Sequence, residues 1–190
     1  MRPLVFQPGA ARAAFAILLA AWLIRELVLQ ARLHGGGRDP SYYAMLAGPA
    51  LAVIGAFVLA DEDARLPGPR WVPAVAGLAL MASGMVFRNW AIQVLGRFFT
   101  VTVGVEEEHE VVDHGPYRLV RHPSYTGMLM FFAGFGIALD SWPSLAAAAL
   151  PTVAAIVIRI SYEERTLRRE LGVPYGEYSG RTSRLIPGVW

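Results

Sequence analysis

A block of polar and aromatic residues interrupts the apolar sequence between residues 115 and 127. It reads Gly-Pro-Tyr-Arg-Leu-Val-Arg-His-Pro-Ser-Tyr-Thr-Gly, and its chemically capable side chains include Arg121 and His122. Pro123 suits the first turn of a helix, where its missing N–H costs no hydrogen bond. The unpaired N–H groups at such a helix start attract a carboxylate. The block therefore indicates either an anion-binding turn or a capped helix with interfacial Arg and Tyr side chains.

Arg159, Glu163 and Glu164 form a second candidate cluster at the end of a later apolar segment. Arg159 and Glu163 are four residues apart, so on a helix they share a face and can pair. A carboxylate near the membrane surface can hold the ammonium group of a cofactor, and a guanidinium binds a carboxylate through two hydrogen bonds. The alternative is a solvated helix exit with ordinary ion pairs.

Arg88 lies with Asn89 and Gln93 in the second half of another apolar segment. Ionisable side chains inside membrane helices are costly and often functional, which makes Arg88 a second candidate for the chemistry. The alternative is a side chain that extends along the helix to the membrane interface. The sequence leaves both interpretations open.

The composition and the missing motifs exclude several classes of protein. The chain has no cysteine, so it has no thiolate chemistry or cysteine zinc site, and all 17 basic residues are arginines, which excludes a Schiff-base or P-loop lysine. His109 and His114 beside the acidic run 106–110 match no metal-site spacing, so we predict no metal. A net charge of +2 and no basic stripe with interleaved aromatics argue against nucleic acid.

The elements that position these candidates are predicted to be membrane helices. Of the 190 residues, 55% are hydrophobic and 17% are charged, whereas a soluble domain has about 25% charged residues. The apolar segments are long enough for spanning helices. We predict one all-α integral membrane domain over residues 1–190. Its five predicted transmembrane helices are residues 10–32, 44–60, 71–95, 124–139 and 144–165.

The arginines also predict how the chain is oriented. Most of them lie between the first two spans, in residues 88–121 or after residue 158, and cytoplasmic segments are enriched in arginine. This predicts an outer N-terminus and a cytoplasmic C-terminus, in a bacterial inner or plasma membrane. The polar candidates then lie on the cytoplasmic side, where we expect a cofactor pocket formed by residues 97–122 and the C-terminal region.

Taken together, these motifs resemble the isoprenylcysteine carboxyl methyltransferase family and the related phospholipid methyltransferases, in a prokaryotic-type form. The matching features are the block 115–127, Arg159 with the Glu163–Glu164 pair, Leu-Gly-Val-Pro-Tyr-Gly-Glu-Tyr at 171–178, and Leu-Ile-Pro at 185–187. The resemblance covers about residues 88–190, which we expect to be the catalytic half. It implies an S-adenosylmethionine-dependent enzyme that O-methylates the carboxylate of a prenylcysteine-like or isoprenoid lipid substrate.

The resemblance also implies roles for individual residues. Arg159 would bind the methyl acceptor, with Arg88 as the second catalytic candidate, and Glu163 would hold the ammonium of the cofactor. The other implied cofactor contacts are His109, Glu110, Val111, Val112, Tyr117, His122, Pro123, Ser124 and Tyr125. A carboxylate acceptor is already ionised at neutral pH and needs no general base.

Three alternatives to this function remain open from the sequence. A phospholipid N-methyltransferase would share the cofactor site, but its amine acceptor would need a Glu or His base. A membrane reductase would bind NADPH, for whose phosphates the sequence offers no glycine-rich loop. A non-enzymatic membrane protein would not require Arg, His, Glu and Tyr to gather on one side. The sequence sets neither the oligomeric state nor the physiological acceptor.

Overall fold

The computed structural model describes residues 3–32, 39–61, 63–100 and 111–190. These residues form helices and no strand, with one isolated bridge between Val120 and Ser183, which confirms the all-α prediction. The main helices are α1 (Ala10–Arg32), α2 (Pro40–Val58), α3 (Trp71–Leu95), α4 (Pro123–Ala138) and α5 (Trp142–Arg181). Short 3-10 helices occur at η1 (Leu4–Phe6), η2 (Gly96–Phe98) and η3 (Gly115–Arg118).

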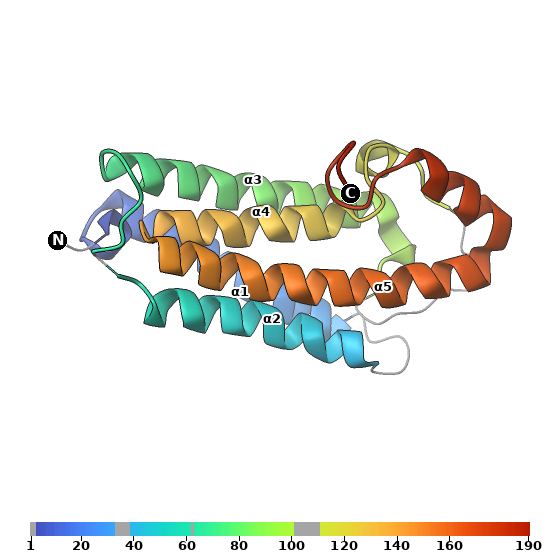
Figure 1. Cartoon of the computed structure of the whole chain (residues 1–190), viewed down its shortest axis with the longest axis horizontal. Helices are drawn as coiled ribbons and strands as arrows, with labels where there is room; N and C mark the ends of the chain where they lie inside the picture. Colours follow the sequence, from blue (N-terminus) through green and yellow to red (C-terminus); the bar gives the residue numbers. More distant parts are fainter. Residues whose placement is uncertain (1–2, 33–38, 62, 101–110) are drawn as a thin grey trace.

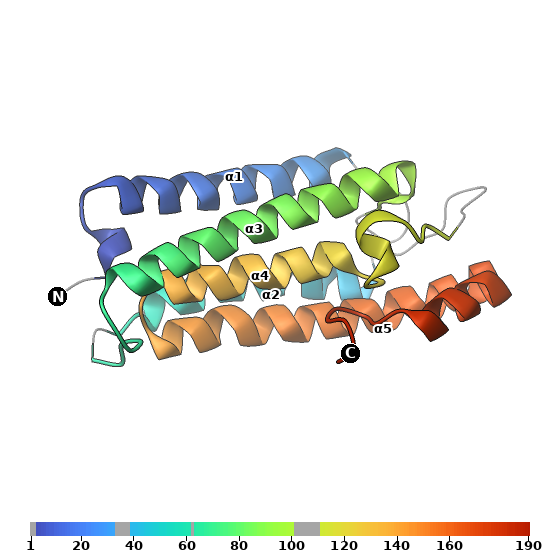
Figure 2. The ribbon, with the colours of Figure 1, turned by 90° about the horizontal axis from the view of Figure 1, so that it is seen from above.

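The five main helices run side by side along the long axis of the molecule (Figures 1 and 2). Helix α4 packs against both α3 and α5, α2 packs against α5, and α1 packs against α3. The α2–α3 and α4–α5 connections lie at the same end as the N-terminus. The start of α2, η3 and the end of α5 lie at the opposite end. The polar candidates therefore gather at one end of the bundle.

The chain is an integral membrane protein by the length and composition of its helices. Four of them, α1, α2, α3 and α5, are long and apolar enough to cross a membrane. Large apolar side chains also remain exposed along the bundle, including Ile17, Leu27, Ile54, Val86 and Leu150. Helix α4 has 16 residues, about 24 Å, which is shorter than a hydrocarbon core of about 30 Å. The total of five spans stays a prediction.

Helix α2 begins at Pro40, four residues before the predicted span. The side chain of Asp39 caps it, because one carboxylate oxygen accepts the backbone N–H groups of Ser41 and Tyr42. Proline in the first turn adds a second start signal. The polar cap thus extends the helix beyond its apolar stretch.

Helix α5 changes direction at Gly172, whose backbone angles are φ 56° and ψ −129°. Residues with a Cβ avoid this conformation, so glycine is required there. The sequence predicts a last span over residues 144–165, and it does not predict the helical segment that follows Gly172. This segment, residues 173–181, folds back toward the start of α4 (Figure 1). Pro174 lies in its first turn, where proline is tolerated.

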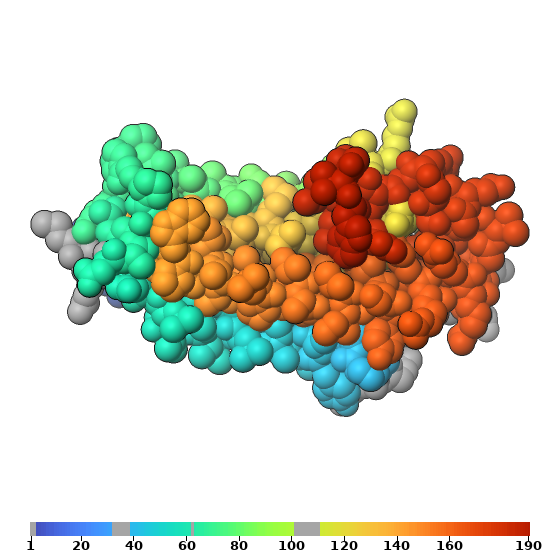
Figure 3. All heavy atoms as spheres, viewed as in Figure 1, coloured from blue at the N-terminus to red at the C-terminus, as the bar shows by residue number. Residues whose placement is uncertain are grey.

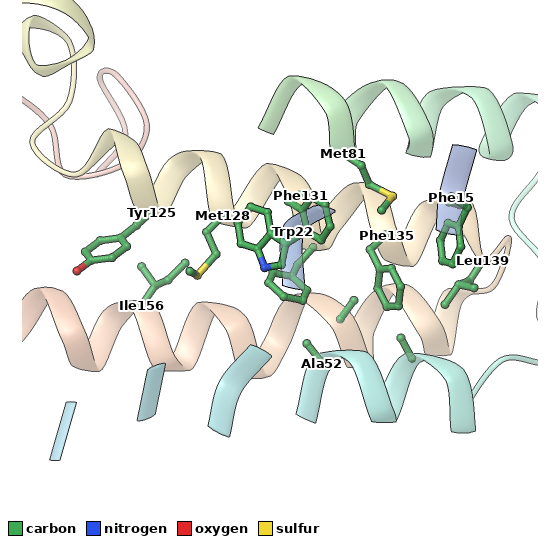
Figure 4. Close-up of a cluster of buried hydrophobic side chains, with 14 of the residues drawn as sticks. Phe15, Trp22, Ala52, Met81, Tyr125, Met128, Phe131, Phe135, Leu139 and Ile156 are labelled. Atoms are coloured by element: carbon green, nitrogen blue, oxygen red, sulfur yellow. The ribbon is translucent and has the colours of Figure 1, made fainter. Parts of the chain in front are cut away.

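Aromatic side chains of α4 fill the centre of the bundle (Figure 4). Phe131, Phe132 and Phe135 are almost fully buried, and the ring of Trp22 from α1 stacks on Phe131 at 4.1 Å between centroids. Tyr125 lies at one end of this row, and its ring extends from α4 toward α5. The apolar core thus leads directly into the polar end of the molecule.

Paired glycines allow α3 and α4 to approach closely. A Cβ on Gly134 would lie 2.6 Å from the carbonyl oxygen of Gly77 and 2.7 Å from the backbone nitrogen of Met81. A Cβ on Gly84 would lie 2.6 Å from the carbonyl oxygen of Gly127. All three contacts are with backbone, which cannot move aside without separating the helices. This close approach therefore fixes the position of the start of α4 relative to α3.

We expect Gly134→Ala to lower the stability of the purified protein by about 1–3 kcal/mol, the usual cost of overpacking a tight core. Thermal unfolding in detergent measures this change. Gly180→Ala is the matched control, because a Cβ at this helical position meets nothing within 4 Å. The control is expected to be neutral or slightly stabilising. Equal melting temperatures for the two variants would contradict this account of the α3–α4 contact.

Candidate functional site

A pocket opens at the end of the bundle where α4 begins. Its empty space, including the open mouth, is about 790 Å³. The segment between α3 and α4, the start of α4 and both parts of α5 form its walls. The lining residues are Leu95, Phe98, Phe99, Thr100, Val111, Val112, Tyr117, Arg121, His122, Ser124, Tyr125, Arg159, Glu163, Thr166, Leu167, Leu171, Tyr175 and Tyr178.

The pocket brings together most of the predicted site residues that the structure describes. These are Val111, Val112, Tyr117, His122, Ser124, Tyr125, Arg159 and Glu163. Pro123 begins α4 but does not line the pocket, and Arg88 does not line it either. The predicted contacts His109 and Glu110 lie outside the described residues.

Arg159, Tyr125 and Glu163 form a hydrogen-bonded group on one wall of the pocket. The hydroxyl of Tyr125 donates to Oε2 of Glu163 at 2.7 Å, and Nε of Arg159 donates to the same hydroxyl at 3.2 Å. Nε of Arg159 also lies 3.8 Å from Oε2 of Glu163, four residues along α5. The side chain of Arg159 is only 3% exposed, whereas that of Glu163 is 28% exposed. A buried cation and a more accessible carboxylate thus lie next to each other.

The backbone of the C-terminal segment positions His122. The N–H of His122 donates to the carbonyl of Arg184 at 3.0 Å, and the N–H of Arg121 donates to that of Ser183 at 2.8 Å. The imidazole ring stacks on Tyr125, with 5.7 Å between centroids. Its Nδ1 lies 3.9 Å from Oε1 of Glu163. Segments 62 residues apart in the sequence therefore build this part of the pocket.

Tyr117, Tyr175 and Tyr178 also line the pocket. The hydroxyl of Tyr178 donates to the carbonyl of Tyr117 at 2.8 Å, and the hydroxyl of Tyr117 donates to the carbonyl of Ala91 at 3.3 Å. Burial raises the pKa of Tyr117 well above its ordinary value, so its phenol remains a hydrogen-bond donor. The buried hydroxyl of Tyr175 has no hydrogen-bond partner among the described residues. Tyr175 is one of the residues that line the pocket.

Glu164, beside Glu163 in the sequence, has a different environment. It is 5% exposed, and its carboxylate accepts hydrogen bonds from Nε of Arg121 at 3.0 Å and from two nitrogens of Arg184 at 3.0 and 3.1 Å. These contacts join α5, the turn before α4 and the C-terminal segment, which stands over α4 and α5 in Figure 3. Glu163 therefore lines the pocket, whereas Glu164 holds together the segments that surround it.

Arg88 ties three helices together instead of entering the pocket. Its Nη2 lies 3.1 Å from a carboxylate oxygen of Glu26 on α1, and its Nη1 donates to the carbonyl of Ser124 on α4. Its guanidinium also lies 5.4 Å from the ring centre of Trp22. Arg88 is 3% exposed, so it does not extend to an interface. The geometry favours a structural role, and of the two predicted catalytic arginines only Arg159 lines the pocket.

Sequence reasoning missed Tyr175, Tyr178 and Arg121 as residues of the pocket. Tyr175 and Tyr178 are three residues apart, so they share one face of the helical segment after Gly172. This spacing was the available signal, but the fold-back that turns this face toward the pocket has no sequence pattern of its own. Among the described residues, no group of three or more His, Asp or Glu side chains could hold a metal ion.

Comparison with known proteins places this architecture in a family. The family model described as phospholipid methyltransferase matches residues 72–173. A probable protein-S-isoprenylcysteine O-methyltransferase of Oryza sativa subsp. indica is 31% identical over 190 residues, which cover 95% of this chain and 99% of the rice protein. Protein-S-isoprenylcysteine O-methyltransferase A of Arabidopsis thaliana is 33% identical over 172 residues, which cover 87% of each chain.

A solved structure has the same fold. It is that of the eukaryotic intramembrane Ras methyltransferase, isoprenylcysteine carboxyl methyltransferase, without a monobody. The TM-score is 0.66 at 23% sequence identity, and the match covers 94% of this chain and 67% of the other. The helical membrane bundle has a polar pocket at one end, and its relatives are methyltransferases. Together these findings define a membrane methyltransferase. The chain belongs to the phospholipid methyltransferase family, in the group that contains the isoprenylcysteine O-methyltransferases.

Proposed function

We propose that this protein transfers a methyl group from S-adenosylmethionine to the carboxylate of a prenylcysteine-like or isoprenoid lipid acceptor. The observation that supports this most is the pairing of Arg159 with Glu163 in one pocket, with the hydroxyl of Tyr125 between them. The arginine offers a cation for the acceptor carboxylate. The glutamate offers an anion for the ammonium of the donor. Two ligands of opposite charge can therefore bind side by side.

The pocket residues fit the donor. Its ammonium requires an accessible carboxylate, which Glu163 provides, and its polar edges require hydrogen-bond donors such as the hydroxyl of Tyr175. The aromatic rings of Tyr117 and Tyr125 suit a positively charged sulfur, since ring faces attract cations. When bound, S-adenosylmethionine supplies an electrophilic methyl group on that sulfur. Val111 and Val112 add apolar wall for the adenosine part.

Arg159 orients the acceptor in this proposal. Its guanidinium can bind a carboxylate through two hydrogen bonds and hold one oxygen toward the methyl group. The carboxylate is ionised at neutral pH, so no side chain has to remove a proton. Direct displacement requires the oxygen, carbon and sulfur to lie in line, and positioning therefore supplies much of the rate. Burial of Arg159 keeps water away from this contact.

The membrane also suits a lipid acceptor. The pocket lies at the end of the bundle where the arginines are concentrated, which supports a cytoplasmic location with the N-terminus on the other side. A lipid tail can stay in the hydrocarbon while its carboxylate reaches Arg159. The exposed apolar side chains of the bundle supply the surface along which such a tail approaches.

We expect Glu163→Gln to weaken binding of S-adenosylmethionine by about 10- to 100-fold, because a hydrogen bond to a charged group contributes about 1.5–3 kcal/mol. Isothermal titration with detergent-purified protein measures the affinity. The melting temperature is expected to stay near that of the original protein, since this side chain is 28% exposed. Glu170→Gln is a suitable control, because Glu170 does not line the pocket. Unchanged affinity in Glu163→Gln would reject the assigned role.

The acceptor is tested with radiolabelled S-adenosylmethionine. We expect label to pass to a farnesylcysteine analogue in a base-labile form, as in a methyl ester. Label that passes instead to phosphatidylethanolamine in a base-stable form would identify an N-methyltransferase and contradict the proposal. Thermal shifts with S-adenosylmethionine and NADPH provide a separate comparison. Stabilisation by NADPH alone would indicate a reductase.

A further inference from the structure

The first residues of α2 reach the guanidinium of Arg159. Nη1 of Arg159 donates to Oγ of Ser41 at 3.1 Å and lies 3.8 Å from Oδ2 of Asp39. Ser41 in turn donates through its hydroxyl to Oδ1 of Asp39 at 2.5 Å. Ser41 is fully buried and Arg159 is 2% exposed. The start of α2 is therefore connected to the cation on α5 by a short chain of buried polar groups.

The two carboxylate oxygens of Asp39 have different roles. Oδ1 caps α2 by accepting the N–H groups of Ser41 and Tyr42 at 2.7 and 3.3 Å. Oδ2 is buried, has no hydrogen-bond partner among the described residues and faces Arg159. Asparagine and serine cap helices about as well as aspartate, so capping does not require the charge or the second oxygen. The contact of the second oxygen with the guanidinium of Arg159 gives a reason for aspartate at this position.

Asp39 is ionised at neutral pH. Partial burial disfavours its charge, but hydrogen bonds from Ser41 and the positive charge of Arg159 outweigh burial, and they hold the pKa of Asp39 below its ordinary value. A fixed negative charge therefore stands behind the guanidinium.

Arg159 is held from two directions. Tyr125 and Glu163 contact its Nε, and Ser41 and Asp39 contact its Nη1. In the proposed function Glu163 is engaged by the ammonium of the donor, which leaves Asp39 as the carboxylate that continues to balance Arg159. A long side chain fixed before the acceptor arrives loses less freedom on binding.

We propose that Asp39 and Ser41 are positioning residues that hold Arg159 in the orientation that binds the acceptor carboxylate. The inference rests on the proposed function and extends the site to the start of α2, outside residues 88–190, where the sequence analysis expects the catalytic half. It requires that loss of either contact with Arg159 weakens acceptor binding while donor binding stays unchanged, because within the pocket both residues contact only Arg159.

Asp39→Asn tests the charge, since asparagine keeps the helix cap. We expect this variant to raise KM for the farnesylcysteine analogue at least 10-fold with a smaller change in kcat. Ser41→Ala is expected to act in the same direction. A second readout needs no turnover: titration of the analogue into protein saturated with S-adenosylhomocysteine is expected to show the same loss of affinity. The affinity for S-adenosylhomocysteine itself is expected to stay within about twofold.

Controls separate positioning from stability. Ser141→Ala removes the cap of α5 at the opposite end of the bundle, and it is expected to lower the melting temperature without changing KM. In an Arg159→Gln background, Asp39→Asn is expected to cause no further loss of analogue binding, since residues that act as one unit are not additive. Equal analogue affinity for the original protein and Asp39→Asn would overturn the inference. If the original protein neither binds nor methylates the analogue, the proposed function itself fails.

Discussion

Replacing Arg159 with glutamine is expected to reduce kcat/KM for a farnesylcysteine analogue by about 100-fold or more. Truncating one partner of a buried, hydrogen-bonded charge pair costs about 2–5 kcal/mol, and in this proposal the partner is the acceptor carboxylate. Methyl transfer at saturating S-adenosylmethionine measures the effect. Because Arg159 is 2% exposed and acts beside Glu163, the loss is expected mainly in acceptor binding and orientation.

Arg159→Lys distinguishes a charge from a guanidinium. Lysine keeps the positive charge but offers no planar fork, so we expect only part of the activity to return. Arg168→Gln is the matched control, since Arg168 lies on the same helix with its side chain 55% exposed and outside the pocket lining. If the control variant lost as much activity as Arg159→Gln, the loss would not be specific to Arg159, and the assigned role would be wrong.

Glu164→Gln is expected to cost about 3–5 kcal/mol of stability, because it leaves the buried guanidinium of Arg121 and the partly exposed one of Arg184 without their counter-charge. Arg121 depends on it most, since the side chain of Arg121 is 8% exposed. For a chain of this length the melting temperature is expected to fall by about 10 °C. Thermal unfolding in detergent measures the fall, and proteolysis shows whether the C-terminal segment detaches.

Glu163→Gln and Glu164→Gln are expected to have different effects. The two variants make the same chemical change at adjacent residues, yet we expect one to lose donor affinity and the other to lose stability. Glu164→Gln at low temperature is expected to retain measurable binding of S-adenosylmethionine. If Glu164→Gln proved as stable as the original protein, the contacts of Glu164 with Arg121 and Arg184 would not be what stabilises the turn before α4.

The sequence predicted the all-helical membrane bundle well because apolar length is a strong signal. It also identified both halves of the pocket, since the block 115–127 and the Glu163–Glu164 pair carry unusual residues at a fixed spacing. The resemblance implies a cofactor role for Glu163, but the residue spacing alone does not show why Glu163 and not Glu164 faces the pocket. Adjacent residues on a helix differ by about 100° in direction, so the decision depends on how α5 is rotated against its neighbours.

Long-range partners explain most of what the sequence missed. Arg88 had two equally open interpretations because its partner Glu26 is 62 residues away, on another helix. Asp39 marks a helix start through its neighbour Pro40, but its contact with Arg159 spans 120 residues. The fold-back at Gly172 depends on one backbone conformation, which composition and periodicity do not reveal.

The short α4 decides how deep the reaction takes place. Helix α3 has 25 residues, about 38 Å, and α5 runs about 45 Å before Gly172, whereas α4 reaches only about 24 Å. Because α4 is shorter than α3 and α5, it leaves space at one end of the bundle, and the pocket lined by Tyr125 opens there. In the proposed function, the acceptor and the donor meet in this recessed space, which a lipid headgroup can reach without leaving its leaflet.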